Sequence, residues 1–113
     1  MNQRIQAEHV HQLDHDQKEI LRSQWTPQEG EYILFADQEE MIYYLAGVEK
    51  HKSLPLLSVG QMIAYISGRD ASFKMHFDSG VWQVSVSGCR YKDAELCDVL
   101  WEAMKRILSH AVQ

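Results

Sequence analysis

The longest helical pattern in the chain lies near its C-terminal end, in the segment DAELCDVLWEAMKRILSHAV. Apolar side chains recur there at spacings of three and four residues, which is typical of an amphipathic helix. They form two adjacent stripes: Leu96, Leu100, Ala103 and Ile107, and Cys97, Trp101, Met104 and Leu108. An apolar arc of this width predicts that a helix over residues 93–111 is the spine of the core.

Apolar and polar residues alternate between residues 72 and 87, as in strands with one buried face. The sequence DSG at 78–80 interrupts the alternation and predicts a tight turn. We therefore expect an antiparallel hairpin, 72–78 against 81–87, with the C-terminal helix across its apolar face. That face consists of Phe73, Met75, Phe77, Trp82, Val84 and Val86. A short strand over residues 31–35 is expected in the same small sheet.

Two shorter helices are predicted from the residues at their ends. Ser58 begins SVGQ, which has the form of a capping box, and Gly68 is the expected stop. DQEEMIYYLAG, residues 37–47, likewise has an aspartate at its start and a glycine at its end. In a helix-turn-helix made of these two, the second helix would have to read the bases, and it offers no lysine or arginine before Arg69, which argues against that motif.

Residues 1–25 are polar and carry only a thin apolar stripe. The sequence DQKE predicts a helix with Asp16 as its cap and Glu19 completing a capping box. A helix this polar is marginal in water by itself, so its apolar side chains need a body or another chain to pack against. The interface residues that we expect in a homodimer are Leu13, Ile20, Leu21 and Trp25.

Together these elements predict an α+β fold. A small antiparallel sheet, built from the hairpin 72–87 and the strand 31–35, packs against three to four helices. At 113 residues the chain has the length of one domain. The expected organisation is a polar helical arm over residues 1–25, followed by a single domain over residues 26–113.

The net charge of −5 argues against a nucleic-acid partner, because affinity for DNA and RNA begins with neutralised phosphates. No apolar run is long enough to span a membrane, and the first residues lack the apolar segment of a signal peptide. A cytoplasmic protein without a membrane partner is therefore expected. Cys89 and Cys97 fit that compartment, because a disulfide-stabilised secreted domain would normally contain more cysteines. Their spacing matches no common zinc pattern, so two reduced thiols are expected.

One stretch, HVHQLDHD at residues 9–16, concentrates residue types that bind metal ions. His11 and His15 are four positions apart and would share one face of a helix, with His9 and Asp14 as further candidate ligands. A catalytic zinc ion needs three protein ligands and a bound water, so a site here would support a metal-dependent hydrolase. The simpler interpretation is a solvated polar segment, and no metal or other cofactor is expected.

Three other residues of types that take part in catalysis lie outside this stretch. His76 and Asp78 lie on the expected hairpin, with His76 on its solvent-facing side. Cys89 precedes Arg90 in an expected loop between strand and helix, where the positive charge would favour a thiolate. The pattern places no histidine beside this thiol, and no phosphate-binding, dinucleotide or nucleophile motif occurs. The sequence therefore predicts no catalytic residues.

The segments LPLLSVGQMIAYISG and ELCDVLWEAMKRIL, with the tryptophan-containing strand between them, resemble small uncharacterised proteins encoded in phages and prophages of Gram-positive bacteria. The resemblance covers residues 54–108. Its matching positions are packing and capping positions, namely Gly60, Gln61, Trp82, Leu96, Leu100 and Trp101. The resemblance implies a provenance and a fold, and it transfers no active site.

A well-patterned core without a convergent catalytic set is typical of a protein that acts through contact with other proteins. We expect a non-enzymatic protein of this kind, with a protein partner: a homodimer, or a small phage-type accessory or inhibitor protein. Two alternatives stay open. One is a metal-dependent hydrolase that uses the stretch 9–16, and the other is a nucleic-acid-binding regulator.

Overall fold

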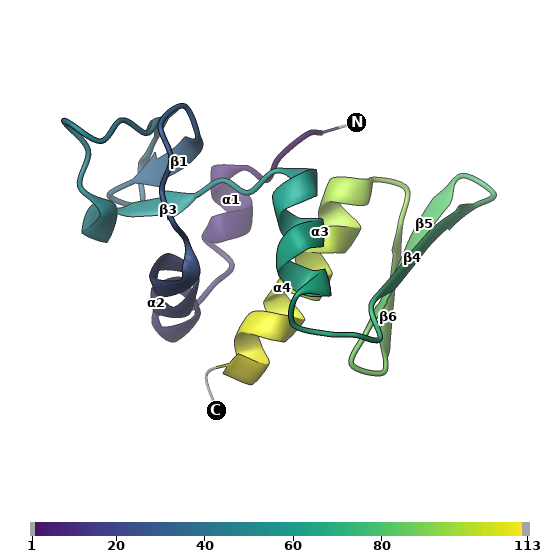
Figure 1. The fold of residues 1–113 in the computed structure, drawn as a ribbon. Helices are drawn as coiled ribbons and strands as arrows, with labels where there is room; N and C mark the ends of the chain where they lie inside the picture. The colour runs from purple at the N-terminus through teal and green to yellow at the C-terminus, as the bar shows by residue number, and fades with distance from the viewer. Residues whose placement is uncertain (1, 112–113) are drawn as a thin grey trace. The chain divides into compact units, whose positions relative to one another are not determined.

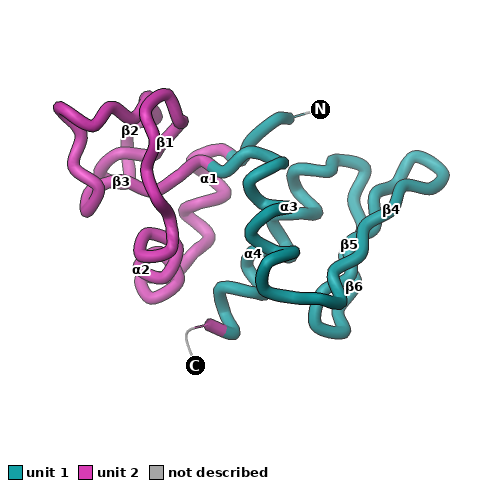
Figure 2. The backbone as a smooth tube through the Cα atoms, viewed as in Figure 1, with its two compact units in different colours: residues 1–5, 57–110 teal, residues 6–56, 111–113 magenta. Residues whose placement is uncertain are grey.

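The computed structural model describes residues 2–111 and confirms an α+β fold. The backbone divides into two compact units: unit 1 holds residues 2–5 and 57–110, and unit 2 holds residues 6–56 and residue 111 (Figure 2). In chain order the elements are α1 (Ala7–Val10), α2 (His15–Gln24), β1 (Tyr32–Phe35), β2 (Glu39–Ile42), a 3-10 turn (Lys50–Lys52), β3 (Ser53–Pro55), α3 (Val59–Ser67), β4 (Lys74–Asp78), β5 (Val81–Val86), β6 (Cys89–Asp93) and α4 (Leu96–Ala111) (Figure 1).

The strands of residues 2–111 form two antiparallel sheets, where a single sheet was expected. The strand order is β2-β1-β3 in unit 2 and β4-β5-β6 in unit 1. The strand expected at residues 31–35 is β1, and both of its edges are occupied, one by β2 and the other by β3. Because β1 has no free edge to offer the hairpin, the prediction of one shared sheet is wrong.

The hairpin of unit 1 is confirmed. β4 pairs with β5 in antiparallel register, and Asp78 lies opposite Val81 at the turn. Ser79 and Gly80 between the strands both have positive φ, 53° and 80°, as a two-residue type I′ turn requires. Glycine adopts this conformation without steric cost, which explains why the turn is recognisable in the sequence.

A third strand, β6, replaces the loop expected after residue 87. Ser87 and Gly88 repeat the pair of positive φ angles seen in the first turn, at 47° and 79°. The chain then runs back along β5, so that Cys89 lies opposite Val86. Cys89 is therefore a half-buried strand residue, and the prediction that it lies in a loop is wrong.

The helix α4 is the core spine of unit 1, as predicted. Its buried side chains are Leu96, Cys97, Val99, Leu100, Trp101, Ala103, Met104 and Leu108. The helix begins later than expected because Asp93 ends β6, where its carboxylate accepts a hydrogen bond from the Glu95 amide at 2.8 Å. Burial raises the pKa of the Cys97 thiol to about 11, which keeps this cysteine protonated at neutral pH.

The helix α3 is also confirmed, together with its capping box. The Ser58 hydroxyl accepts a hydrogen bond from the Gln61 amide at 3.1 Å, and the Gln61 side chain accepts one from the Ser58 amide at 2.8 Å. Figure 1 shows α3 and α4 on one side of the β4-β5-β6 sheet. Val84 and Val86 on the apolar face of that sheet are buried, as expected for a face that helices cover.

Residues 3–5 are joined to the start of α3 by backbone hydrogen bonds. The Ile5 amide donates to the Leu57 carbonyl at 2.9 Å, and the Val59 amide donates to the Gln3 carbonyl at the same distance. Residues 2–5 therefore belong to unit 1, although residues 6–56, which follow them in the chain, build unit 2. Unit 2 is an insertion between two neighbouring points of unit 1.

The helix predicted over residues 37–47 is wrong. Ala36 and Asp37 have positive φ, 53° and 61°, and turn the chain so that Phe35 lies opposite Glu39 on β2. A helix cap needs extended backbone, which the left-handed conformation of Asp37 excludes. Since this segment contains the strand β2, the first of the two helices of the helix-turn-helix alternative is not present.

The helix α2 begins two residues earlier than predicted. Asp14 is the cap instead of Asp16: its carboxylate accepts a hydrogen bond from the Gln17 amide at 2.8 Å, and the Gln17 side chain accepts one from the Asp14 amide at 2.9 Å. Asp16 lies in the first turn, where its negative charge faces the positive end of the helix dipole.

Residues 6–25 belong to unit 2 together with residues 26–56. The boundaries between the two compact units therefore differ from the domain boundary expected after residue 25. Trp25 packs edge-on against Tyr43, with 5.7 Å between ring centroids, in a cluster of buried side chains. Leu13, Leu21 and Trp25 are buried within the chain itself, and Ile20 is half-buried. The homodimer stays a prediction, but three of the four side chains assigned to its interface are turned to the interior.

In unit 1 the carboxylate of Asp70 joins two loops. It accepts hydrogen bonds from the amide and hydroxyl of Ser72, at 2.9 and 2.6 Å, and from the amide and hydroxyl of Ser87, at 2.7 and 3.2 Å. The Ser72 contacts are the main reason that the pKa of Asp70 lies below its ordinary value, and the Ser87 contacts add to the effect. The charged carboxylate thereby holds the loop before β4 to the turn after β5.

We expect Asp70→Asn to lower the melting temperature at neutral pH. Because the pKa of Asp70 is lower in the folded chain than its unfolded value of about 3.9, the stabilisation is complete above that pH and is lost as pH falls through the folded pKa. The difference in melting temperature between wild type and variant should therefore shrink when melting curves are recorded from neutral pH down to acid. Glu40→Gln, which neutralises an exposed carboxylate on β2, is the control. A difference that stays constant down to acid pH would contradict this role.

Candidate functional site

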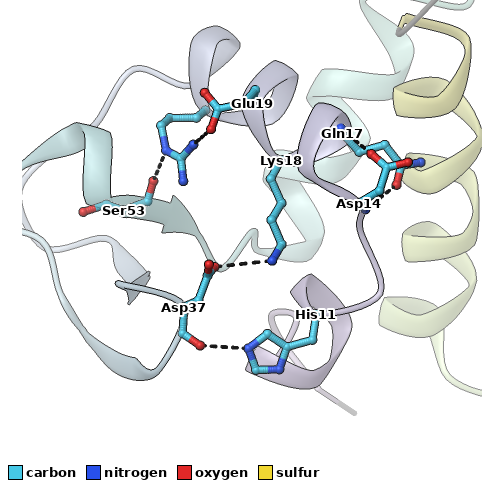
Figure 3. A network of polar contacts seen from close by, with 8 residues as sticks. His11, Asp14, Gln17, Lys18, Glu19, Asp37 and Ser53 are labelled. Atoms are coloured by element: carbon cyan, nitrogen blue, oxygen red, sulfur yellow. Dashed lines mark hydrogen bonds and ion pairs between the residues drawn. The ribbon is translucent and has the colours of Figure 1, made fainter.

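Three of the four candidate metal ligands near the start of the chain make hydrogen bonds in the local structure, and Figure 3 shows those of His11 and Asp14. His9 Nδ1 accepts a hydrogen bond from the Gln6 amide at 2.9 Å, and Asp14 caps α2. The His11 ring lies 3.0 Å from the Asp37 carbonyl through Nε2, which must carry the proton because a carbonyl only accepts. His15 is the first residue of α2 and is exposed. Residues 2–111 contain no group of three His, Cys, Asp or Glu side chains that could hold a metal ion.

Polar contacts around this stretch connect α2 to the first sheet. Lys18 Nζ lies 3.5 Å from the Asp37 carboxylate at the turn between β1 and β2. Arg22 pairs with Glu19 and donates through Nε to the Ser53 carbonyl on β3 at 3.1 Å (Figure 3). These polar side chains of α2 therefore take part in the packing of unit 2.

We expect micromolar zinc to leave the melting temperature unchanged. Within residues 2–111 no three candidate ligands converge on one point, so a zinc ion would find too few ligands there for a stable site. A site with a dissociation constant a thousandfold below the free zinc concentration would add about 4 kcal/mol to the free energy of unfolding. The measurement compares thermal melting with zinc chloride and with a chelator. An upward shift that His11→Ala abolishes would instead support the hydrolase alternative.

A shallow depression of about 550 Å³ lies in unit 2, lined by Glu19, Arg22, Ser23, Glu49, Lys50 and His51. Several of its charged side chains form ion pairs: Arg22 pairs with Glu19, and Glu49 contacts His51 at 3.1 Å and the neighbouring Lys52 at 3.6 Å. The Ser23 hydroxyl donates to the Ile20 carbonyl at 2.9 Å. A shallow depression lined mostly by exposed charged groups is typical of a solvated surface.

The clearest functional feature of unit 2 is a group of exposed apolar side chains on the β1–β2 hairpin. Tyr32 and Ile42 lie directly opposite each other, and Tyr44 and Leu45 follow β2. The exposed fractions of these four side chains are 46, 50, 49 and 65%. Gly47 makes room for the ring of Tyr44, because a Cβ there would collide with it. We call these four residues the Tyr32 patch.

Unit 1 has an exposed strand edge. β4 is an outer strand of its sheet, and all five of its side chains are exposed. Met75 and Phe77, on the apolar face, are 37 and 55% exposed, and the Phe77 ring lies 4.9 Å from that of Trp82, centroid to centroid. Strand edges with apolar side chains are open to pairing with another chain.

The opposite face of this sheet is polar and basic. His76, Gln83 and Lys92 form one row across the strands, and Lys74, Ser85 and Arg90 form the next. Depressions of about 230 and 300 Å³ lie over these rows. Within residues 2–111, Lys74, Arg90 and Lys92 have no ion-pair partner. His76 is exposed on the polar face, as predicted, and Asp78 lies two positions further along the same face.

The sequence analysis predicted neither the Tyr32 patch nor the exposed edge of β4. The Tyr32 patch falls mostly inside the segment predicted as a helix, and the β4 edge depends on which strand lies outermost. Comparison with known proteins found no matching family model, and no curated protein or solved structure similar to this chain. No helix within the described residues is long and apolar enough to cross a lipid bilayer.

Proposed function

We propose that this protein acts by binding another protein, without catalytic chemistry of its own, and that the Tyr32 patch is the contact surface. The observation that carries the proposal is the exposure of four large apolar side chains, two on the β1–β2 hairpin and two directly after it. Single exposed apolar residues are common on any surface, whereas contiguous ones mark sites of interaction.

The composition of the patch fits this role. Tyr32 and Tyr44 combine a large apolar ring with a hydroxyl that hydrogen-bonds at the rim, and tyrosine is enriched among the residues that dominate interface energetics. Ile42, opposite Tyr32, adds a branched apolar side chain at the centre. An apolar pocket on the partner, with polar groups around it, would complement this surface. An accessory or inhibitor protein, with the phage provenance that the sequence resemblance implies, would act through such a contact.

The experiment places a photo-crosslinking amino acid at position 32 in the cells that produce the protein. The partner protein identified in the cross-linked product is then purified by itself and titrated with the wild-type chain. We expect Ile42→Glu to weaken binding by about tenfold or more, because it buries a charge in an apolar contact.

Gln38→Glu is the matched control. It adds the same charge at the exposed turn of the same hairpin, outside the patch, and should leave affinity unchanged. If the purified partner binds Ile42→Glu as tightly as wild type, or if position 32 yields no cross-linked protein, the Tyr32 patch is not the contact surface.

A second candidate function, nucleic-acid binding, is favoured by the unpaired cations of the β4-β5-β6 sheet. Lys74, Arg90 and Lys92 project from one face of a chain that is acidic as a whole. Phosphate contacts by such groups make affinity fall steeply with salt. Titration of a labelled single-stranded oligonucleotide at several salt concentrations tests this function: a steep salt dependence that Arg90→Ala reduces would support it, and absence of binding at low salt would reject it.

A further inference from the structure

We propose that β4 is the interface of a homodimer: it pairs with β4 of a second copy, antiparallel and centred on His76, and joins the two sheets into one of six strands. The inference rests on the proposed function, contact with proteins, but it uses a surface in the other unit. It also replaces the residues that the sequence assigned to a dimer interface, most of which are buried.

The outer edge of β4 has backbone groups to offer. In a hairpin closed by a two-residue turn, the residues that flank the turn, here Asp78 and Val81, exchange backbone hydrogen bonds. Bonded and non-bonded positions alternate along an antiparallel pair, so the backbone groups of His76 and Lys74 also face β5. Those of Met75 and Phe77 face outward, and within residues 2–111 neither has another backbone partner.

Antiparallel pairing centred on His76 joins these outward groups to each other. Met75 then lies opposite Phe77 of the partner subunit, and the two residues exchange both of their backbone hydrogen bonds. The twofold axis repeats the exchange on the other side of His76. Each outward amide and carbonyl of the strand is thereby satisfied, in the mode by which edge strands bind extended chains.

The charges of β4 are complementary to themselves in this arrangement. The strand reads KMHFD, with a cation at its first position and an anion at its last. Lys74 of each subunit lies opposite Asp78 of the partner subunit, at a pair of positions where side chains come close together. Lys74 has no ion-pair partner within the described residues, and the Asp78 carboxylate contacts only the neighbouring Ser79 hydroxyl, at 3.4 Å.

The apolar face is complementary as well. Met75 of one subunit meets Phe77 of the other, a sulfur–aromatic contact. The exposed fractions of these side chains, 37 and 55%, would fall at the same time, and Trp82 behind Phe77 extends the apolar surface. Pairing of β4 thus covers the apolar residues that the isolated sheet leaves in water.

Other arrangements of the two strands do not give this complementary pairing of charged and apolar side chains. Parallel pairing in register would set Lys74 against Lys74 and Asp78 against Asp78 of the partner subunit, which is unfavourable. A slip by one residue would put apolar and polar side chains on the same face. The charge pattern therefore selects the antiparallel register centred on His76.

The test exchanges the charges at the two ends of β4. Lys74→Asp makes both ends of the strand negative, and Asp78→Lys makes both ends positive, so each variant alone places like charges at two cross-strand positions. We expect each to weaken the dimer by about tenfold or more, measured by sedimentation velocity over a concentration series.

A mixture of the two variants provides the decisive measurement. Each negative end then faces a positive end, so an equimolar mixture of Lys74→Asp and Asp78→Lys should dimerise when neither variant does so alone. Because the mixture restores opposite charges across the interface, its dimerisation also excludes a general loss of folding in either variant. Lys92→Asp makes the same charge change on the polar face of the other outer strand, β6, and should leave the dimer intact.

A wild-type chain that stays monomeric over the whole series would overturn the homodimer, as would variants that dimerise like wild type or a mixture that fails to associate. These results leave the proposed function standing if the Tyr32 patch still binds its cross-linked partner. Conversely, loss of that partner with an intact β4 dimer rejects the Tyr32 patch alone.

Discussion

Replacing Trp101 by alanine is expected to lower the free energy of unfolding by about 3–5 kcal/mol. Trp101 is 1% exposed at the centre of α4, among the other buried side chains of that helix. Its removal leaves a cavity that the surrounding side chains fill only in part, so the lost transfer energy and the cavity both contribute. Urea unfolding followed by circular dichroism measures the change.

Glu102→Ala, at the next position of the same helix, is the control. Glu102 is exposed and pairs with Lys105 at 3.0 Å on the surface. Surface pairs of this kind contribute little, and we expect a change within about 0.5 kcal/mol. If Trp101→Ala unfolds at the same denaturant concentration as wild type, α4 is not the core spine.

Trp25→Ala is expected to destabilise the protein by about 3–5 kcal/mol as well, independently of protein concentration. The ring is buried with Ile33, Tyr43 and Val48 in unit 2. A residue at the interface of a dimer would behave differently, because its loss would change stability in a concentration-dependent way. Unfolding curves recorded at two protein concentrations therefore separate a core role from the interface role that the sequence suggested.

Trp25→Phe refines this prediction. The Trp25 indole Nε1 is buried and has no hydrogen-bond partner among the described residues. A buried donor without a partner is unfavourable, so phenylalanine removes that penalty while it keeps part of the packing. We expect a cost below about 1.5 kcal/mol. Equal losses for the phenylalanine and alanine variants would show that the indole nitrogen is bonded in solution.

The elements that were predicted correctly are those whose signals lie within a few residues. Ser58 and Gly68 bracket α3, and the Ser79–Gly80 turn marks the first hairpin. The apolar arc of α4 is similarly a property of one continuous segment. In these cases the local backbone preference and the final packing agree.

Residues 37–47 show why other elements could not be predicted. An aspartate at the start and a glycine at the end fit a helix, but Asp37 adopts a left-handed turn conformation and β2 pairs with β1. That pairing depends on tertiary structure, which overrides local propensity. For β6 a local signal did exist: Cys89 and Tyr91 alternate with Arg90 and Lys92 directly after a serine–glycine turn.

The candidate sites follow the same division. The histidines at 9–16 stand out by residue type, yet their contacts are those of caps and turns. The Tyr32 patch and the β4 edge consist of ordinary apolar and charged residues. Whether such residues are exposed and grouped depends on their cross-strand neighbours and on the order of strands in each sheet. The pattern of a single sequence does not contain this information.

The insertion of unit 2 between Ile5 and Leu57 has a consequence for synthesis on the ribosome. Residues 2–5 leave the exit tunnel before unit 2, but the carbonyl that accepts the hydrogen bond of the Ile5 amide belongs to Leu57, and α4 is translated later than both. At roughly 5–20 residues per second, the opening segment waits several seconds for its neighbours. Residues 6–56, which are all of unit 2 except its part at residue 111, are translated before α4, so they have the opportunity to fold first and to bring residues 5 and 57 of unit 1 together.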